Sequence, residues 1–542
     1  MKYNLSGNII DVENKKIFSG TIYVENGKIS KIKKDNKKYD QFIIPGFIDA
    51  HIHIESSMIT PSEFARAATP HGTIAVVTDP HEIANVLGIE GVKYMIEDGK
   101  KSPMKFYFSA PSCVPATKFE TNGATLGLEE TEELLKMEEI KYLGEFMDFP
   151  AVINDDPIAL GKIQLAKKYS KNIDGHAPFV SQSDLRKYVE AGISTDHECI
   201  TERDALEKIE LGLKVLIREG SACTDFSKLI PILEDDYQSC MFCCDDKHPD
   251  DLIENHINEL VKRALDYGVD LMKVLQTACV NPVKHYGLEV GLLQEGDDAD
   301  FLVIDDPKKM NILKTYIKGE IVSEKGETTI PRSTSTLINK FKTKIKNISN
   351  FKITPKGRTI NVIGVDQGIV ATNRLIETAK IEDNKVVSDI ENDVLKIAVV
   401  NRYEDVKPAL GFVKGFGLEK GAIASSIAHD SHNIVVVGVD DESIVNAVNA
   451  IIKKKGGICV ANKDKIDILP LPIAGIISDL ECKEVAQRYQ HIDSIAKELG
   501  STLIAPLMTL SFMTLLVIPE LKLSDRGLFS GANFEFVELF NT

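Results

Sequence analysis

The chain has 542 residues, a length at which two or three hydrophobic cores are expected rather than one. Its net charge of −17 argues against a nucleic-acid partner, because phosphate backbones are bound by clustered cations. No apolar run reaches the ~20 residues of a membrane helix, so we expect no membrane partner. Nine cysteines, an odd number without small-scaffold spacing, indicate reduced thiols and a cytoplasmic protein.

Residues 1–42 have the alternating pattern of short antiparallel strands. Within them, Glu25-Asn26-Gly27-Lys28 has the sequence of a hairpin turn, because Asn and Gly tolerate positive φ. Residues 285–332 return to short strands, with a second turn at Lys318-Gly319. Since so small a β unit is unstable alone, we expect the two segments to form one discontinuous β domain.

Between residues 43 and 284, apolar runs alternate with amphipathic helical stretches such as Pro157–Lys168. The predicted strands are Ile43–Ile54, Thr73–Asp79, Lys105–Ser112, Ile140–Phe146, Asn172–His176, Ile193–His197, Lys214–Glu219 and Ser239–Asp245. Eight βα units predict an α/β fold with a TIM-type (β/α)8 barrel, whose active site lies at the carboxyl ends of the strands. Residues 335–542 mix strand and helix patterns and predict a separate C-terminal α+β domain.

The first barrel strand carries the pair His51-Ile52-His53. Because side chains alternate along a strand, both imidazoles lie on one face with Asp49 and Glu55, about 6–7 Å apart along the strand. Two neutral imidazoles at this spacing can hold one metal ion. Taken alone, the pair is equally compatible with polar histidines on a half-exposed strand.

Further metal-ligand side chains follow the other barrel strands. Together with the first pair, the candidates are His51, His53, Glu145, His176, His197 and Asp245. Four histidines, a glutamate and an aspartate are the ligand types that two divalent ions sharing a bridge would use. The nearby Cys240, Cys243 and Cys244 we interpret as buried small hydrophobes, since no second Cys pair completes a thiolate site.

These strand-end residues resemble those of the amidohydrolase superfamily. Longer motifs resemble the bacterial and archaeal adenine deaminase family. They are the segments 45–57, 79–86, 217–221, 244–249, 415–418 and 428–433. The resemblance spans nearly the whole chain, and the later motifs are the specific ones.

The resemblance implies that His51 and His53 bind one metal ion with Asp245, and that His176 and His197 bind a second. Superfamily members bridge the two ions with a carboxylated lysine or a glutamate from the fourth strand. Glu145 is our bridging candidate, and Lys141 is the alternative. The family is iron- or manganese-dependent, so Mn²⁺ or Fe²⁺ is expected, while mixed N/O ligands also permit Zn²⁺.

The implied reaction is hydrolytic deamination of adenine to hypoxanthine and ammonia. Two divalent ions lower the pKa of a shared water, and Asp245 would accept the water proton. A second acid must protonate the purine ring, and the candidates are Glu219 and His81, with Glu219 preferred because it sits directly at a strand end. The residues expected to bind or orient the base are Asp246, Arg218, Asp79 and Glu82. Arg218 and Glu82 could instead form ion pairs that shape the rim.

Two alternative functions and the role of one histidine pair have to be considered at this point. A related enzyme could keep the metals and hydrolyse a cyclic amide or an N-acyl amino acid. A scaffold without activity would require missing ligands, and none is missing. His429 and His432 in the C-terminal region could hold a metal, reach over the barrel mouth or only pack in a polar loop. We expect a homo-oligomer, with a dimer as the guess.

Overall fold

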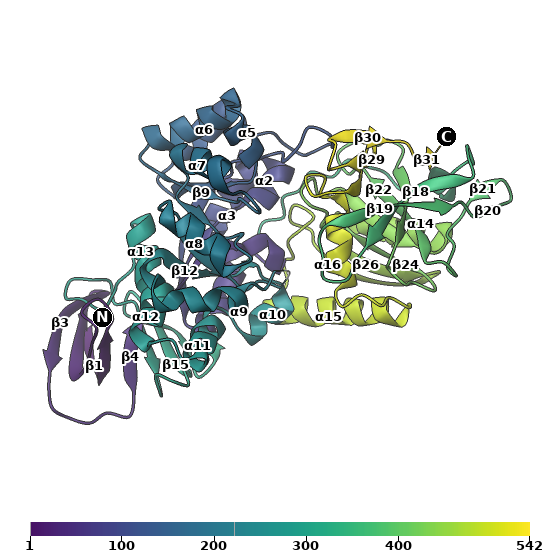
Figure 1. Cartoon of the computed structure of the whole chain (residues 1–542). Helices are drawn as coiled ribbons and strands as arrows, with labels where there is room; N and C mark the ends of the chain where they lie inside the picture. The colour runs from purple at the N-terminus through teal and green to yellow at the C-terminus, as the bar shows by residue number, and fades with distance from the viewer. Residues whose placement is uncertain (1, 222, 542) are drawn as a thin grey trace. The chain divides into compact units, whose positions relative to one another are not determined.

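The computed structural model describes residues 2–221 and 223–541 (Figure 1). The chain divides into two compact units. The first comprises Met1–His81, Val92–Cys113 and Leu126–Thr334, and the second comprises Glu82–Gly91, Val114–Thr125 and Ser335–Thr542. Among the described residues, no helix has both the length and the apolar character needed to cross a membrane.

One antiparallel-rich sheet of the first unit combines strands from both ends of its sequence (Figure 1). Its order is β17-β16-β15-β14-β4-β1-β2-β3. The strands are β1 (Lys2–Asp11), β2 (Lys16–Glu25), β3 (Lys28–Lys34), β4 (Phe42–Pro45), β14 (Phe301–Ile304), β15 (Ile312–Ile317), β16 (Glu320–Glu324) and β17 (Glu327–Thr328). The predicted hairpin turn is confirmed, because Glu25 pairs with Lys28 and both Asn26 and Gly27 have positive φ. Ile22 and Phe301 meet in the core of this sheet, which explains why neither segment suffices alone.

Each of the eight predicted barrel strands has a counterpart, and these counterparts form two parallel sheets. The prediction of one strand over residues 43–54 is wrong, because residues 42–45 form β4 of the first sheet, and the predicted strand 239–245 is divided into β12 and β13. One sheet has the order β13-β5-β6-β7-β8-β9, and a second has the order β10-β11-β12. The strands are β5 (Phe47–His53), β6 (Thr73–Thr78), β7 (Lys105–Ala110), β8 (Ile140–Phe146), β9 (Asn172–Gly175), β10 (Thr195–Asp196), β11 (Lys214–Arg218), β12 (Cys240–Cys243) and β13 (Asp245–Asp246). Within the described residues, backbone pairing therefore forms two parallel sheets rather than one closed ring. Because parallel strands end at the same edge, the residues that follow them gather there.

Helices connect these parallel strands, as expected for α/β units. The predicted helix Pro157–Lys168 is confirmed as α6, whereas the predicted helical stretch 83–96 is broken at Gly88, whose φ is +63°. The helices are α1 (Pro61–Ala68), α2 (His81–Leu87), α3 (Ile89–Gly99), α4 (Leu128–Leu135), α5 (Phe149–Ile153), α6 (Pro157–Lys168), α7 (Gln182–Glu190), α8 (Glu202–Glu210), α9 (Phe226–Leu229), α10 (Pro249–Glu254), α11 (Ile257–Tyr267), α12 (Leu271–Leu275) and α13 (Asn281–Tyr286).

The second unit is built on a largely antiparallel sheet with the order β19-β18-β23-β22-β25-β24-β26-β27, and β31 pairs with β18. Its strands are β18 (Thr359–Val365), β19 (Thr372–Thr378), β20 (Ile381–Glu382), β21 (Lys385–Val386), β22 (Val394–Val400), β23 (Ala409–Lys414), β24 (Ala422–Ser425), β25 (Ile434–Gly438), β26 (Gly457–Asn462), β27 (Lys465–Pro470), β28 (Leu521–Ser524), β29 (Gly527–Ser530), β30 (Glu535–Val537) and β31 (Phe540–Asn541). Its helices are α14 (Asp441–Lys454), α15 (Cys482–Glu498) and α16 (Pro506–Ser511). The apolar stripe of α14, including Ile444 and Ile451, packs with Val436 of the sheet. Packing of helices against one largely antiparallel sheet accounts for the mixed strand and helix pattern of the sequence, as in other α+β domains.

A capping carboxylate offers a test of the helical part of the fold. Asp156 accepts hydrogen bonds from the backbone N–H groups of Ile158 and Ala159 at 2.8 and 3.0 Å. Asp156→Ala leaves these first-turn N–H groups without their acceptor, so it should destabilise the first unit by about 1 kcal/mol. Thermal denaturation should show a melting temperature lower by a few degrees. The exposed Glu210→Ala is the control and should shift it much less.

Candidate metal centre

The Glu145 carboxylate lies at the middle of the gathered strand ends. Glu145 is the sixth residue of β8 and is buried. Its Oε1 lies 3.1 Å from His53 Nε2, and its Oε2 lies 2.8 Å from His176 Nδ1 and 3.2 Å from His197 Nε2. Burial alone would raise the pKa of Glu145, but the imidazoles outweigh it and hold this pKa well below its usual value. The carboxylate is therefore ionised and shared between two groups of histidines.

The first of these groups comes from β5 and β13. His53 Nε2 lies 3.1 Å and His51 Nε2 lies 3.7 Å from Asp245 Oδ1. The two strands pair in parallel, with Asp245 opposite Ile52, which places the carboxylate between the two imidazoles. Asp245 has a φ of +58°, a left-handed conformation that Asp adopts more readily than most residues. Local backbone geometry thus turns this side chain toward the site.

The second group comes from β9 and β10. The rings of His176 and His197 are 5.2 Å apart, and the ring of His197 stacks on that of His51 at 4.2 Å. Burial lowers the pKa of His176, but Glu198 and Glu145 outweigh it and raise the pKa to about 9. Burial also lowers the pKa of His51, and the neighbouring His197 and His53 lower it further. The neutral form that this favours for His51 is the form that binds metals.

The donor set fits divalent metal ions. Ligand atoms lie within 4.8 Å of one another in four overlapping groups, which are His51/His53/Asp245, His51/Glu145/His197, His53/His81/Glu145 and His176/His197/Glu198. Both ring nitrogens of His51 are buried and make no hydrogen bond to any described residue. Buried imidazole nitrogens without such partners are costly, and a bound cation would satisfy them. The residues present therefore suit a metal centre of mixed nitrogen and oxygen ligands.

Asp79, expected to contact a substrate, uses both carboxylate oxygens inside the protein. Its Oδ1 accepts a hydrogen bond from Ser109 Oγ at 2.7 Å, and its Oδ2 accepts the backbone N–H of Glu145 at 3.0 Å. A Cβ at Gly144 would lie 2.4 Å from Asp79 Oδ2, so only glycine leaves room for this approach. Asp79 is fully buried and steadies the strand that carries Glu145. Its sequence-based assignment to the base stays a prediction.

Arg218, at the end of β11, forms ion pairs with three carboxylates. Its Nη1 donates to Asp245 Oδ2 at 2.8 Å and to Glu198, and its Nη2 donates to Asp225 Oδ2 at 3.2 Å. Glu198 Oε1 also lies 3.6 Å from His176 Nδ1 and 3.5 Å from His197 Nε2. Glu198 is not among the site residues predicted from the sequence. The signal that could have identified it is its position directly after His197.

The two candidates for the second acid lie in different surroundings. His81 Nδ1 is 3.5 Å from Glu145 Oε1, and its ring is 4.6 Å from that of His53. Glu219 instead pairs with the guanidinium of Arg263 on α11. His81 therefore lies at the histidine and carboxylate cluster, whereas Glu219 is paired with a side chain of α11.

Asp246, which was expected to contact the base, is half-buried and accepts a hydrogen bond from Ser56 Oγ.

Glu82 belongs to the second unit, together with His429 and His432. His429 Nδ1 lies 2.7 Å from Glu82 Oε1, and His432 Nε2 contacts Glu82 Oε2. The two histidines lie in the connection between β24 and β25, not on a helix, so the helical spacing considered for them does not apply. His429 also stacks on Phe512 at 4.9 Å. Both imidazoles are thus engaged with one carboxylate of their own unit.

Comparison with known proteins shows which families the chain is similar to. Residues 42–322 match the family described as "Amidohydrolase family", and residues 369–535 match "Adenine deaminase C-terminal domain". The chain is 49% identical over 540 residues to a protein of Salinibacter ruber named adenine deaminase, covering 99% of each chain. It is 52% identical over 535 residues to an adenine deaminase of a Sulfurovum species, covering 98% of this chain and 99% of that one. A β-aspartyl dipeptidase structure from Fervidobacterium islandicum matches 61% of this chain and 100% of its own at a TM-score of 0.47 and 13% identity.

The match over residues 42–322, together with the parallel strands and the buried histidine and carboxylate cluster, identifies the chain as a member of the amidohydrolase family. The C-terminal match and the full-length identity narrow this further. The chain belongs to the adenine deaminase family.

The position of Glu145 between the two histidine groups predicts the metal content of a variant that lacks its charge. Glu145→Gln keeps the side-chain volume but removes the charge that is shared between the histidine groups, so most bound metal should be lost. Elemental analysis of the purified variant should find less than one equivalent per chain. Glu132→Gln, which alters an α4 carboxylate that pairs with Lys168, is the control and should keep the wild-type content. Retention of two equivalents by Glu145→Gln would show that Glu145 does not bridge.

Proposed function

We propose that the protein hydrolyses adenine to hypoxanthine and ammonia. The observation that carries this proposal is the identity of about half of all residues, over 98–99% of the chain, to proteins named adenine deaminase. A complete set of candidate metal ligands at the strand ends supports it.

In this proposal the centre holds two divalent ions. His51, His53 and Asp245 would hold one, His176 and His197 would hold the other, and Glu145 would be shared. The distances of 2.8–3.2 Å from its oxygens to three imidazoles support the sharing. Mn²⁺ or Fe²⁺ suits this mixed set, and Zn²⁺ is compatible with it. When bound, such ions lower the pKa of a water and supply hydroxide near neutral pH.

The fold proposed around this centre is a single (β/α)8 barrel that joins the two parallel sheets. Contacts between β9 and β10 and between β12 and β5 support closure. We assign residues 43–284 to this barrel, residues 1–42 plus 285–332 to the small β domain, and residues 335–542 to the C-terminal domain. A cytoplasmic location and a homodimer remain predictions from the sequence.

Asp245 is the proposed proton carrier. Its Oδ1 faces His51 and His53, while its Oδ2 accepts a hydrogen bond from Arg218 at 2.8 Å. Burial by itself raises the pKa of Asp245, but His53 and Arg218 outweigh this and hold the pKa well below its usual value. The carboxylate is therefore ionised, which is the form a proton acceptor must have, and in this proposal it would take the water proton and deliver it to the leaving amine.

His81 is the proposed acid that protonates the purine ring, ahead of Glu219. It directly borders the cluster, with its Nδ1 3.5 Å from Glu145 Oε1, whereas Glu219 is engaged by Arg263. Asp246 lies one residue beyond Asp245 and is half-buried, which suits contact with the amino group or ring nitrogens of a base. Arg218 acts through Asp245, because its guanidinium is occupied by carboxylates. The assignment of Glu82 to the base stays a prediction.

The substrate assignment is tested directly. Purified protein loaded with Mn²⁺ or Fe²⁺ should release ammonia from adenine, with the absorbance change from adenine to hypoxanthine. Asp245→Asn keeps the shape of the side chain but cannot accept the proton, so kcat should fall by roughly 10²–10⁴-fold. Hydrolysis of a cyclic amide or an N-acyl amino acid, together with no turnover of adenine, would contradict the proposal.

Two matched variants distinguish between His81 and Glu219 as the acid that protonates the purine ring. His81→Gln should lower kcat by roughly 10²–10⁴-fold with a small change in KM, because it removes a proton donor. Glu219→Gln should change kcat much less, because only its pairing with Arg263 is altered. Metal analysis of both proteins checks that the centre is still loaded. The reverse order of effects would assign the acid to Glu219.

A further inference from the structure

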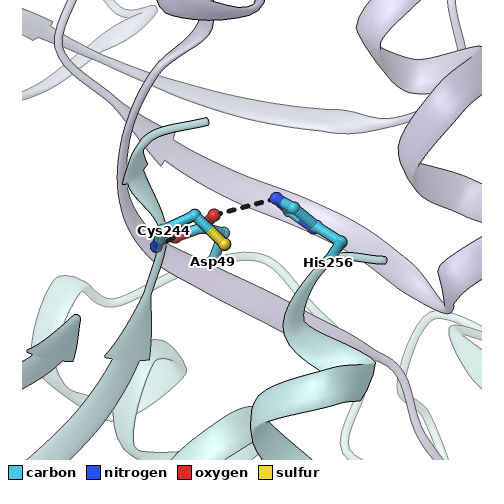
Figure 2. A group of neighbouring side chains, drawn as sticks. All are labelled: Asp49, Cys244 and His256. Carbon is cyan, nitrogen blue, oxygen red and sulfur yellow. Dashed lines mark hydrogen bonds and ion pairs between the residues drawn. The ribbon is translucent and has the colours of Figure 1, made fainter. Parts of the chain in front are cut away.

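A second buried group, formed by Asp49, Cys244 and His256, lies beside the metal centre in the first unit (Figure 2). Asp49 is on β5, two residues before His51, and is fully buried. Its Oδ1 accepts the backbone N–H of His51 at 3.2 Å and that of Cys244 at 3.1 Å. Its Oδ2 lies 3.0 Å from His256 Nε2, the pair joined by a dashed line in Figure 2. One carboxylate therefore contacts three segments of the chain.

His256 extends this group to a further strand. It precedes α11 and is fully buried, and its Nδ1 lies 2.6 Å from Thr73 Oγ1 at the start of β6. The ring of Phe64 lies edge-on to it at 5.6 Å. The imidazole is thus hydrogen-bonded at Nδ1 and packed against an aromatic ring, while its Nε2 lies within ion-pair distance of Asp49 Oδ2 without forming a hydrogen bond there. Its orientation toward Asp49 is set by packing rather than by solvent.

The two backbone groups bound by Asp49 belong to, or adjoin, proposed metal ligands. His51 donates its own N–H, and Cys244 directly precedes Asp245. Asp245 has a left-handed φ of +58°, and such backbone persists only where the surroundings hold it. The hydrogen bond from the Cys244 N–H to Asp49 fixes the residue that directly precedes this left-handed Asp245. Asp49 therefore ties the backbone of one ligand to the backbone of the next.

A role confined to stability would not require a buried hydrogen-bond acceptor here. Burying a carboxylate is costly unless it is hydrogen-bonded and paired, and apolar packing of similar volume is often at least as stable. Asp49 avoids this cost by accepting two N–H groups and by lying against His256. What the carboxylate adds over an apolar side chain is a fixed distance between β5 and the β12–β13 junction, where His51 and Asp245 lie.

We propose that Asp49 and His256 are positioning residues for the metal centre. Asp49 sets the backbones of His51 and Asp245 relative to each other, and His256 holds the Asp49 carboxylate in the orientation that does so. The proposal rests on the proposed metal centre but not on the identity of the substrate. Cys244 takes part through its backbone N–H, and its thiol, which also contacts the Asp49 carboxylate, is not required by the proposal.

The experiment measures the rate at which Mn²⁺-loaded protein releases metal to an excess of chelator. Asp49→Ala removes both backbone acceptors, and loss of such outer partners weakens metal binding by roughly 10–100-fold, so release should be faster by a similar factor. Asp49→Asn keeps an oxygen that can accept both N–H groups and should restore most of the retention. His256→Ala should accelerate release in the same direction and to a smaller extent. Cys244→Ala should release metal at the wild-type rate.

Asp300→Ala is the matched control for lost stability. Asp300 is also fully buried in the first unit and accepts two backbone N–H groups, from Gly291 at 3.0 Å and Lys318 at 2.8 Å, with Lys105 as its charged partner. This variant should lower the melting temperature as Asp49→Ala does, but it should leave metal release unchanged. A merely structural role for Asp49 would make the two variants release metal alike.

Three results would overturn the proposal. They are equal metal release by Asp49→Ala and Asp300→Ala, no recovery in Asp49→Asn, and a third metal equivalent that disappears in Cys244→Ala. The last result would make the group a metal site of its own. Wild-type protein that retains two ions but does not turn over adenine would contradict the proposed substrate only, and the comparison of release rates would still decide the role of Asp49.

Discussion

The Glu145 carboxylate is the point on which the first unit's chemistry depends. Four imidazoles, from four different strand ends, lie within 3.5 Å of its oxygens, and these belong to His53, His81, His176 and His197. Such a cluster forms only if strands far apart in the sequence end at the same edge, which parallel pairing ensures. The neighbouring His51 has two buried ring nitrogens that make no hydrogen bond to a described residue, and a cation would satisfy them. Fold and ligand set therefore support the same conclusion, a metal centre at the strand ends.

Buried aspartates hold the backbone around this cluster. Asp79 accepts the N–H of Glu145, and Asp49 accepts the N–H groups of His51 and Cys244. Asp196 does the same for the residues that directly follow His176 and His197, since it accepts the N–H groups of Ala177 and Glu198. Each carboxylate bonds to a residue that is a ligand candidate or lies next to one. These aspartates therefore form an outer layer of carboxylates around the candidate ligands.

Much of the first unit is predictable because local patterns decide it. Apolar runs followed by His, Glu or Asp identify the eight strands and the six ligand candidates, and Pro157–Lys168 becomes a helix as its capped pattern indicates. Contacts that depend on tertiary pairing are not predictable in this way. The link from Asp49 to His256 joins residues 207 positions apart, and Arg218 reaches Glu198 across strands. Periodicity also cannot reveal that Glu219 is bound by Arg263, or that His429 and His432 share Glu82.

The central claim is that Glu145 bridges two metal ions held by opposite groups of histidines. Diffraction from crystals of the Mn²⁺-loaded protein, with anomalous differences measured at the manganese edge, tests it most directly. The account predicts two peaks about 3.5–4 Å apart, with one oxygen of Glu145 directed to each. A single peak, or two peaks that Glu145 does not contact, would contradict it.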